Sequence, residues 1–346
     1  MTDDTPARAA NIFDVARLAG VSHQTVSRVI NDLPNVRPAT KARVEHAIAQ
    51  LRYSPSPAAR ALVTRRTRTI GLVTPGVPDF GPSAIAMHFN AAARTARYTV
   101  DSVSLLDEDP AAGVRSAVEG LLRQRVDAIA LVVVDLAALE TVRNIELSIP
   151  MVASAATSRR HPRLVSIDQY RGARQAVRHL AELGHTRILH LAGPSQAPDA
   201  VERVRGWRDE LAERRLEIVE PVAGDWSAAS GYRAGSELEI APGMAVFAGN
   251  DQMSIGLLSA LRERGLRVPE EVSVVGYDDV PEAAFLFPAL TTIRQDFAAL
   301  GELMMQKLLL AFEEPDRVTE DTPIPTRLVV RQSTRAAGPL TPPTAG

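Results

Sequence analysis

Apolar residues recur at helical spacing in three short segments between residues 12 and 51. Gly20 ends the first segment, Ser22 suits the N-cap of the second, and Pro38 suits the first turn of the third. The apolar positions of the three faces are Ile12, Val15, Ala16, Ala19, Val26, Val29, Ile30, Val44, Ala47, Ile48 and Leu51. Three short helices with a glycine turn between the first two predict a helix-turn-helix unit.

From Thr69 onward the pattern changes to short apolar runs that alternate with helical patterns. The runs that predict strands are TIGLVT, YTVDSVSL, AIALVVV, PMVASA, RILHLAG, AVFAGN and VSVVGYDD. Helical patterns between them include residues 82–97, 170–183, 200–213 and 251–265. Continuous apolar strands are typical of parallel sheets covered on both faces, so we expect an α/β fold of doubly wound sheets. The segment is long enough for two lobes.

Composition bounds the class of protein. The 346 residues are 45% hydrophobic and 23% charged, as in ordinary soluble proteins. The sequence has neither an apolar run long enough for a membrane helix nor a secretory signal at its start, so we expect no membrane partner. The absence of cysteine excludes disulfides and thiolate chemistry and fits a cytoplasmic protein.

Charge is distributed unevenly along the chain. Residues 1–68 contain eleven basic and five acidic residues, a net charge of +6, whereas the remainder has 28 basic and 36 acidic residues, a net charge of −8. A small basic head on an acidic body indicates that the head alone meets a polyanion. Charge by itself also fits a merely soluble basic segment.

Specific motifs resemble those of the lactose-repressor and galactose-repressor family of bacterial transcriptional regulators. DVARLAGVSHQTVSRVIN and RVEHAIAQLRYSPSPAARAL resemble its DNA-binding head. LAELGHTRILHLAGP, VRGWRDEL, GDWSAASGY, GNDQMSIGLLSALRERGLRVPEEVSVVGYDD and PALTTIRQDFAALG resemble its ligand-binding core. The resemblance implies a repressor that binds operator DNA as a homodimer and is released by a small carbohydrate, a galactoside or related sugar. It also implies a two-lobed core like that of periplasmic binding proteins.

These arguments predict a domain order. Residues 1–10 and 337–346 are expected to be disordered, 11–55 to form the head, and 56–67 to form a hinge helix and linker. The N-terminal core lobe is expected to contain residues 68–166 and 296–324, and the C-terminal core lobe residues 167–295 and 325–336. No heptad pattern follows Arg335, so we expect a dimer without a tetramer-forming helix.

The second helix of the head is expected to read bases. Its start would point His23, Gln24, Ser27 and Arg28 outward, and such side chains lie in the major groove in helix-turn-helix proteins. Arg28 suits guanine and Gln24 suits adenine. The resemblance further implies that Thr25, Asn31 and Tyr53 contact the DNA backbone. With Ser22, and with Ala59 and Leu62 below, the predicted DNA-binding set is Ser22, His23, Gln24, Thr25, Ser27, Arg28, Asn31, Tyr53, Ala59 and Leu62.

The linker contains PAARAL, with Ala59 and Leu62 on one face of a two-turn helix. The resemblance implies that Leu62 wedges into the minor groove at the centre of the operator, where an apolar side chain unstacks a base step. The alternative is that Leu62 packs on the core.

Polar side chains of the core suit a polyol. A carboxylate, a guanidinium and an amide can bond paired hydroxyls, and an indole packs against the C–H face of a sugar. Trp207 lies on the apolar side of its segment and is expected in the core, whereas Trp226 is expected in the cleft. Asp278 is assigned to the ligand and Asp279 to structure, because adjacent residues at a strand end point apart. With the positions that the resemblance supplies, the predicted ligand set is Asp79, Pro82, Ser83, Ile85, Ile167, Arg203, Trp226, Asn250, Asp278, Gln295 and Phe297.

Several alternatives stay open. Ile167 stands where galactoside-binding relatives often have an aromatic residue, and Asp79 stands where the lactose repressor is apolar, so the sugar is undefined. A purine corepressor, a solute-binding protein of the same core fold and an α/β enzyme with a DNA module are the rival functions. We expect no enzyme, cofactor or metal, because no nucleophile–base pair, glycine-rich phosphate loop or zinc-ligand spacing is present.

Overall fold

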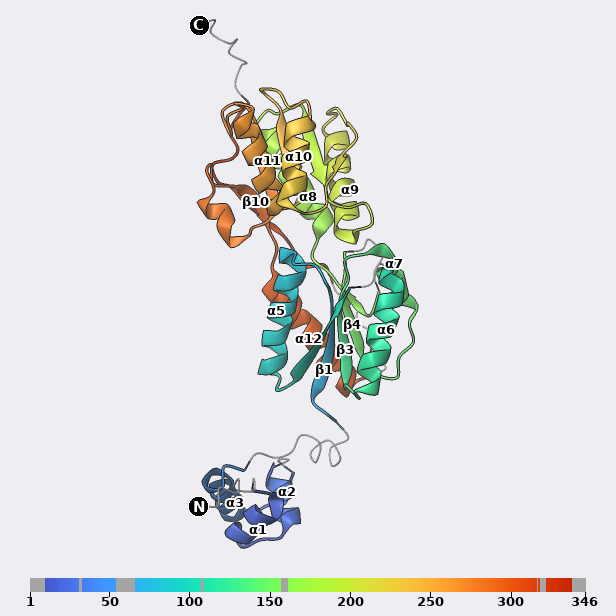
Figure 1. Cartoon of the computed structure of the whole chain (residues 1–346), viewed down its shortest axis with the longest axis vertical. Helices are drawn as coiled ribbons and strands as arrows, with labels where there is room; N and C mark the ends of the chain where they lie inside the picture. The colour runs from blue at the N-terminus through green and yellow to red at the C-terminus, as the bar shows by residue number, and fades with distance from the viewer. Residues whose placement is uncertain are drawn as a thin grey trace, which may run out of the picture. The chain divides into compact units, whose positions relative to one another are not determined.

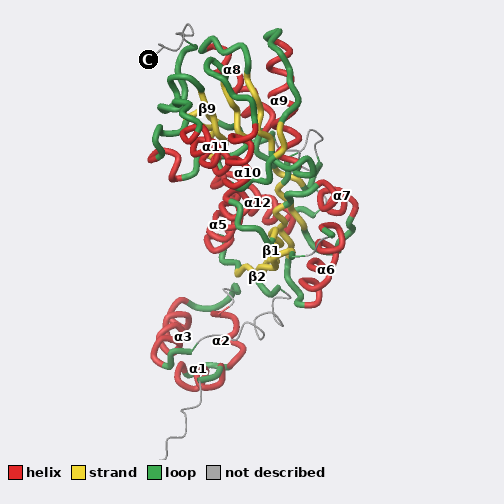
Figure 2. Tube along the Cα trace, turned by 45° about the horizontal axis from the view of Figure 1, so that its top comes forward, coloured by secondary structure: helices red, strands yellow, loops and turns green. Residues whose placement is uncertain are grey.

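The computed structural model describes residues 10–30, 33–53, 66–106, 109–156, 161–315, 317 and 322–337 (Figures 1 and 2). The chain divides into two compact units, residues 1–69 and 70–346. Asn31, Ala59, Leu62 and all but the last two positions of the predicted linker lie outside the described residues, as do nearly all of the two terminal segments expected to be disordered.

The head consists of three helices, α1 (Ile12–Ala19), α2 (His23–Ile30) and α3 (Pro38–Gln50). Gly20 ends α1 in the left-handed conformation, with φ 63°, which glycine adopts without steric cost. The Ser22 hydroxyl accepts a hydrogen bond from the Thr25 N–H at 3.2 Å and caps α2. The predicted apolar faces form one small core around Val15, Val26 and Val44, so the predicted helix-turn-helix is confirmed.

The first lobe of the core is built on a five-stranded sheet of order β2-β1-β3-β4-β5. One buried cluster packs α5 and α12 against one face, and another packs α6 and α7 against the other. The elements are β1 (Thr69–Pro75), α5 (Phe80–Thr95), β2 (Thr99–Leu105), α6 (Pro110–Arg123), β3 (Ala128–Val132), α7 (Leu136–Asn144), β4 (Met151–Ser154), β5 (Leu164–Val165) and α12 (Phe297–Glu313).

The second lobe contains a six-stranded sheet of order β11-β10-β9-β8-β6-β7, in which only the β10–β11 pair is antiparallel. Buried clusters again cover both faces. The elements are α8 (Gln169–Glu182), β6 (Ile188–Ala192), α9 (Pro198–Glu213), β7 (Val222–Ala223), α10 (Ala228–Glu237), β8 (Ala245–Ala248), α11 (Asp251–Glu263), β9 (Ser273–Asp278), the 3-10 helix η1 (Pro281–Phe285), β10 (Thr291–Arg294) and β11 (Arg327–Val329).

The chain passes between the two lobes three times, as Figure 1 shows. The first crossing lies between β5 and α8, the second between β10 and α12, and the third between α12 and β11. An isolated bridge between Ile167 and Ile324 holds the first and third crossings side by side. The doubly wound α/β fold predicted for the core is therefore confirmed. No helix of the described parts is both long and apolar enough to span a lipid bilayer.

Candidate DNA-binding head and ligand cleft

The beginning of α2 presents an exposed polar surface. Ser22, His23, Gln24 and Arg28 are exposed, while Val26 and Val29 on the opposite face are buried in the head. Thr25 and Ser27 are half-buried, and Tyr53 packs against the apolar cluster of the head. The predicted reading face thus projects away from the small core, as a helix that enters a groove must do.

Phe13, which is not among the predicted DNA-binding residues, also belongs to this surface. Its side chain is 58% exposed although it is large and apolar, and its ring centroid lies 5.2 Å from that of His23. An exposed aromatic residue beside the predicted reading face suits contact with a thymine methyl group. Its position in α1 looked merely like the edge of an amphipathic helix, so no sequence signal distinguished it.

A cavity of about 350 Å³ lies between the two lobes of the core. The second lobe contributes residues from the ends of its strands and the starts of its helices, including Arg203 of α9 and Asp278 of β9. The first lobe contributes the start of α5 and the ends of β3 and β4. Ligands of parallel α/β sheets bind at the carboxyl ends of the strands, which is where this cavity lies.

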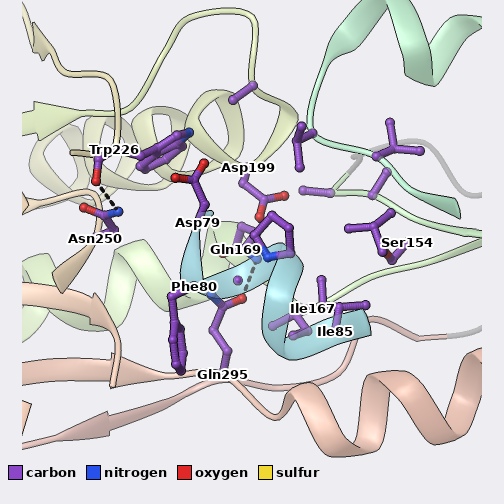
Figure 3. Close-up of a pocket in the computed structure, with 18 of the residues that line it drawn as sticks. Asp79, Phe80, Ile85, Ser154, Ile167, Gln169, Asp199, Trp226, Asn250 and Gln295 are labelled. Carbon is purple, nitrogen blue, oxygen red and sulfur yellow. Dashed lines mark hydrogen bonds between the residues drawn. The ribbon is translucent and has the colours of Figure 1, made fainter. Parts of the chain in front are cut away.

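Four side chains form a closed ring at the second-lobe wall. The Arg203 Nε donates to Gln169 Oε1 at 3.0 Å. Gln169 Nε2 donates to Gln295 Oε1 at 2.7 Å, as Figure 3 shows. Gln295 Nε2 donates to Asp278 Oδ1 at 2.6 Å, and the Arg203 guanidinium lies 3.7 Å from the same oxygen. All four residues are buried, so the ring holds its geometry without a ligand.

The Arg203 guanidinium is further fixed by its other neighbours. It donates to the Gly249 carbonyl, lies 3.6 Å from Asp199 and stacks 3.9 Å above the centre of the Tyr277 ring. These partners compensate for burying a cation that is only 4% exposed.

Asp278 and Asp279 turn in opposite directions at the end of β9, as the sequence predicts. Asp278 lines the cavity, whereas Asp279 pairs with Arg294 and, at 2.6 Å, with Arg331. Both residues have positive φ angles, 110° and 58°, a backbone conformation that is strained for residues other than glycine. The ion pairs of Asp279 hold this turn and thereby aim Asp278 at the cavity.

Burial changes the acidity of two neighbouring carboxyl groups. Desolvation raises the pKa of Asp278 to about 6, although Arg203 and Gln295 oppose the shift. Asp251, at the start of α11, is fully buried, and its burial together with the charge of Asp278 raises its pKa to about 8. Asp251 accepts hydrogen bonds from Thr292 Oγ1 at 2.6 Å and from the Val280 N–H at 2.9 Å. Asp251 therefore joins the start of α11 to β10 and to the segment that follows β9, next to the cavity.

Trp226 and Asn250 lie together on the same wall. The Asn250 amide donates to the Trp226 carbonyl at 2.9 Å, and its oxygen caps α11 by accepting from the Met253 N–H at 2.9 Å. The Trp226 ring packs on Gly193, where a Cβ would lie 2.1 Å from the indole. The missing side chain at Gly193 thus makes room for the indole. Trp207, by contrast, is fully buried in the core, as predicted.

The first-lobe wall is mostly apolar. Pro82, Ile85, Ile167 and Phe297 line the cavity with Leu300. Phe80 packs against buried clusters of both lobes, and its ring meets Phe297 edge-on at 5.8 Å between centroids. Polar residues interrupt this surface, among them Asp79 at the start of α5, Asp135 at the start of α7 and Ser154 at the end of β4.

The lobes also touch along one rim of the cavity. The Leu136 N–H of the first lobe donates to the Gln196 carbonyl of the second at 2.9 Å. The Asp199 carboxyl lies along the cavity as well, and burial raises its pKa. The Leu136–Gln196 bond joins the two lobes directly at the rim of the cavity.

Ten of the eleven predicted ligand residues line this one cavity; Ser83 does not. Ser83 lies in a separate depression with Thr74 and Ser104, because one step along α5 from Pro82 turns the side chain by about 100°. The lining residues that were not predicted include Gln169, Asp199 and Ser154. No group of three side chains suited to hold a metal ion occurs among the described residues.

Known proteins show the same arrangement. Residues 11–56 match the family of bacterial regulatory proteins called the lacI family, and residues 177–334 match a periplasmic binding protein-like domain. The chain is 33% identical over 336 residues to the lactose operon repressor of Escherichia coli, which covers 95% of this chain and 92% of that protein.

Solved structures agree with this assignment. The lac repressor dimer bound to operator and the anti-inducer ONPF matches with a TM-score of 0.85 at 32% identity, covering 95% of this chain and 100% of that one. A complex of the transcriptional regulator CelR with cellobiose matches with a TM-score of 0.68 at 30% identity, covering 94% and 99%. The chain therefore belongs to the lacI family of DNA-binding transcriptional regulators.

Proposed function

We propose that this protein is a repressor that binds operator DNA as a homodimer and releases it when a small saccharide, a galactoside or related sugar, enters the cleft. The observation that carries the proposal is the wall of Arg203, Asp278, Asn250 and Trp226 in a chain that also has an exposed α2 reading face. Charged and amide groups beside an indole suit paired hydroxyls and a C–H face. The relatives are regulators, and we propose no catalytic activity for this chain, which would act in the bacterial cytoplasm.

An exposed apolar surface supports pairing of two chains. Phe285, at the end of η1, is 88% exposed, and Phe287, two residues further on, is 98% exposed. Neighbouring aromatic side chains exposed to this degree are typical of surfaces that another protein covers. A twofold pair would present two α2 helices to the half-sites of a pseudo-palindromic operator.

Release follows from linkage between the two sites. A ligand that contacts both walls changes the angle between the lobes, and we propose that this shift separates the two linkers of the dimer. A ligand that weakens operator binding must bind the operator complex less tightly by the same factor. To change the occupancy of the operator by the repressor from nearly full to nearly empty, the ligand must bind the free protein about 5 kcal/mol more favourably than it binds the operator complex.

The test begins with selection of an operator from random duplexes by the full-length chain, followed by fluorescence anisotropy. Arg28→Ala is expected to lower the ratio of operator affinity to random-duplex affinity by about 5- to 150-fold, because a bidentate base contact contributes about 1–3 kcal/mol. Arg52→Ala, which alters an exposed arginine after α3, is the control and leaves that ratio unchanged. An unchanged ratio in Arg28→Ala would contradict the assignment of α2.

The second part of the test concerns the effector. Lactose and cellobiose are titrated into the operator complex, with hypoxanthine and guanine as the purine arm. Release by a saccharide supports the proposal, whereas tighter operator binding with a purine would replace it by a corepressor. Leu62→Ala is expected to lose tight operator binding while its affinity for the saccharide is unchanged.

A further inference from the structure

The charges around the cavity are strongly unbalanced. Among the described residues that line it, five are aspartates and one is an arginine: Asp79, Asp135, Asp199, Asp225, Asp278 and Arg203. The arginine is already occupied by the Gln169 oxygen, the Gly249 carbonyl and the carboxylates of Asp199 and Asp278. The lining therefore has no cation left to pair with an anionic ligand.

Four of the five aspartates have partners of their own. Asp135 caps α7 by accepting from two backbone N–H groups, and Asp225 accepts from Ser227 and pairs with Arg233. The carboxylates of Asp199 and Asp278 form ion pairs with the Arg203 guanidinium. These four carboxylates are accounted for by the fold.

Asp79 is different. It occupies the N-cap position of α5, but its carboxylate makes no capping hydrogen bond there and accepts none from the other described side chains. It is half-buried, and it lines the cavity together with Trp226 (Figure 3). Burial and the nearby charge of Asp225 on the opposite lobe raise its pKa. A cation placed here would relieve both the loss of solvation and the repulsion between the lobes.

An independent observation places a ligand against the same first-lobe wall. The Ser154 side chain lines the cavity, is only 3% exposed, and its hydroxyl has no hydrogen-bond partner among the described residues. A buried hydroxyl without a partner costs about 1–3 kcal/mol, which a ligand hydroxyl would recover. In Figure 3 Ser154 lies well apart from Asp79, so one ligand that reached both would span the cavity.

We propose that Asp79 makes the cleft select its saccharide by charge, so that a sugar bearing an ammonium group is preferred to its neutral parent and a uronic acid is rejected. This inference rests on the proposed function, since it assumes that a saccharide fills the cleft. The ammonium would donate to the Asp79 carboxylate between the lobes, while hydroxyls of the same ligand meet the second-lobe ring and Ser154.

Titration calorimetry of the full-length protein with a matched series tests the proposal. The series consists of lactose and cellobiose, their 2-amino and 6-amino derivatives, and the corresponding uronides. At neutral pH we expect at least one amine to bind at least tenfold more tightly than its parent and every uronide at least tenfold more weakly. In Asp79→Asn, which keeps the size of the side chain, the preference for the amine should fall below twofold.

The outcomes are distinguishable. Ser154→Ala is the matched control on the same wall and should weaken the neutral sugar and its amine by the same factor. Neutral sugars that bind with no amine preferred, or a preference that survives in Asp79→Asn, would overturn the charge selection and leave the proposed function intact. Failure of every member of the series to bind would contradict the proposed function itself, and this inference with it.

Discussion

The two lobes meet the cleft with walls of different kinds. The second-lobe wall is a closed ring of buried hydrogen bonds around Arg203, and its polar groups already have partners. The first-lobe wall is apolar, with Asp79 and Ser154 as polar groups without side-chain partners. A preorganised wall lowers the entropic cost of binding any polyol, whereas unpartnered groups favour the ligand that satisfies them. On the proposed function, the second lobe would bind sugars in general and the first would choose among them.

The largest effect is expected where the ring is broken. Arg203→Ala would leave Asp278 buried beside Asp199 and Asp251 without its cation, which should cost about 3–5 kcal/mol of unfolding free energy at neutral pH and abolish saccharide binding. Urea denaturation measures the first effect and calorimetry the second. Arg205→Ala is the control on the same helix, because its side chain is 45% exposed and its ion pair contributes at most about 1 kcal/mol. Equal denaturation midpoints for the two variants would show that the ring is not a structural unit.

The pH dependence of stability should come mainly from the second lobe. The folded pKa of Asp251 is about 8 and that of Asp278 about 6, both above the unfolded value of 3.8. The folded state therefore keeps protons that the unfolded chain has released, and stability falls as pH rises through this range. From about pH 6.5 to 8 Asp251 alone should cost about 2 kcal/mol, since each pKa unit corresponds to about 1.4 kcal/mol.

Asp251→Asn removes the titratable carboxyl group but keeps a polar group toward Thr292. In urea denaturation at several pH values, this variant is expected to show a smaller dependence of the unfolding free energy on pH. The measurements are confined to pH values above 6.5 because of His190. Burial lowers the pKa of this histidine to about 4, so between pH 4 and 6.5 its titration makes stability rise with pH, opposite to the effect of Asp251. A wild-type stability that is constant across the window would exclude a buried proton on Asp251.

The sequence predicted the fold better than it predicted the connections within the site. The run AIALVVV predicts a buried strand because it is continuously apolar, and all five residues of β3 within it are buried. The sequence pattern did not predict the strand β10, TTIR. Its residues Thr291 and Thr292 are polar, yet they are buried, because their hydroxyls form hydrogen bonds with Thr334 and Asp251. Such partners are distant in sequence, so the two threonines look like a polar turn. β5 and β7, with two residues each, carry no periodicity.

The same reason explains the missed site residues. Gln169 is an ordinary helix-start glutamine until the fold brings Gln295 and Arg203 to it from 126 and 34 residues away. Ser154 ends a strand of small and apolar residues, where a serine is unremarkable. Residues inside a specific motif, such as Trp226 and Gln295, were predicted, whereas Gln169, which lies outside the quoted motifs, was not.

The platform for the sugar should be sensitive to its support in the second lobe. In Gly193→Ala the new Cβ would collide with the Trp226 indole and displace it, at a cost near the low end of about 1–3 kcal/mol. We expect saccharide affinity to fall about tenfold while the operator affinity of the free protein is unchanged. Gly120→Ala is the control, because a Cβ there meets only the end of the Arg123 side chain at 3.8 Å. Wild-type affinity in Gly193→Ala would mean that the indole is not the platform.

The smallest effect on stability, and the sharpest contrast with Arg203, is expected for Ser154→Ala. Removing a buried hydroxyl that has no partner relieves an unfavourable burial, so the free protein should be unchanged or stabilised by up to about 1 kcal/mol in urea denaturation. The same change should weaken saccharide binding several-fold, because the ligand hydroxyl then meets a methyl group. A loss of stability together with unchanged saccharide affinity would show that Ser154 serves the first lobe itself, and the division of labour between the two walls would no longer hold.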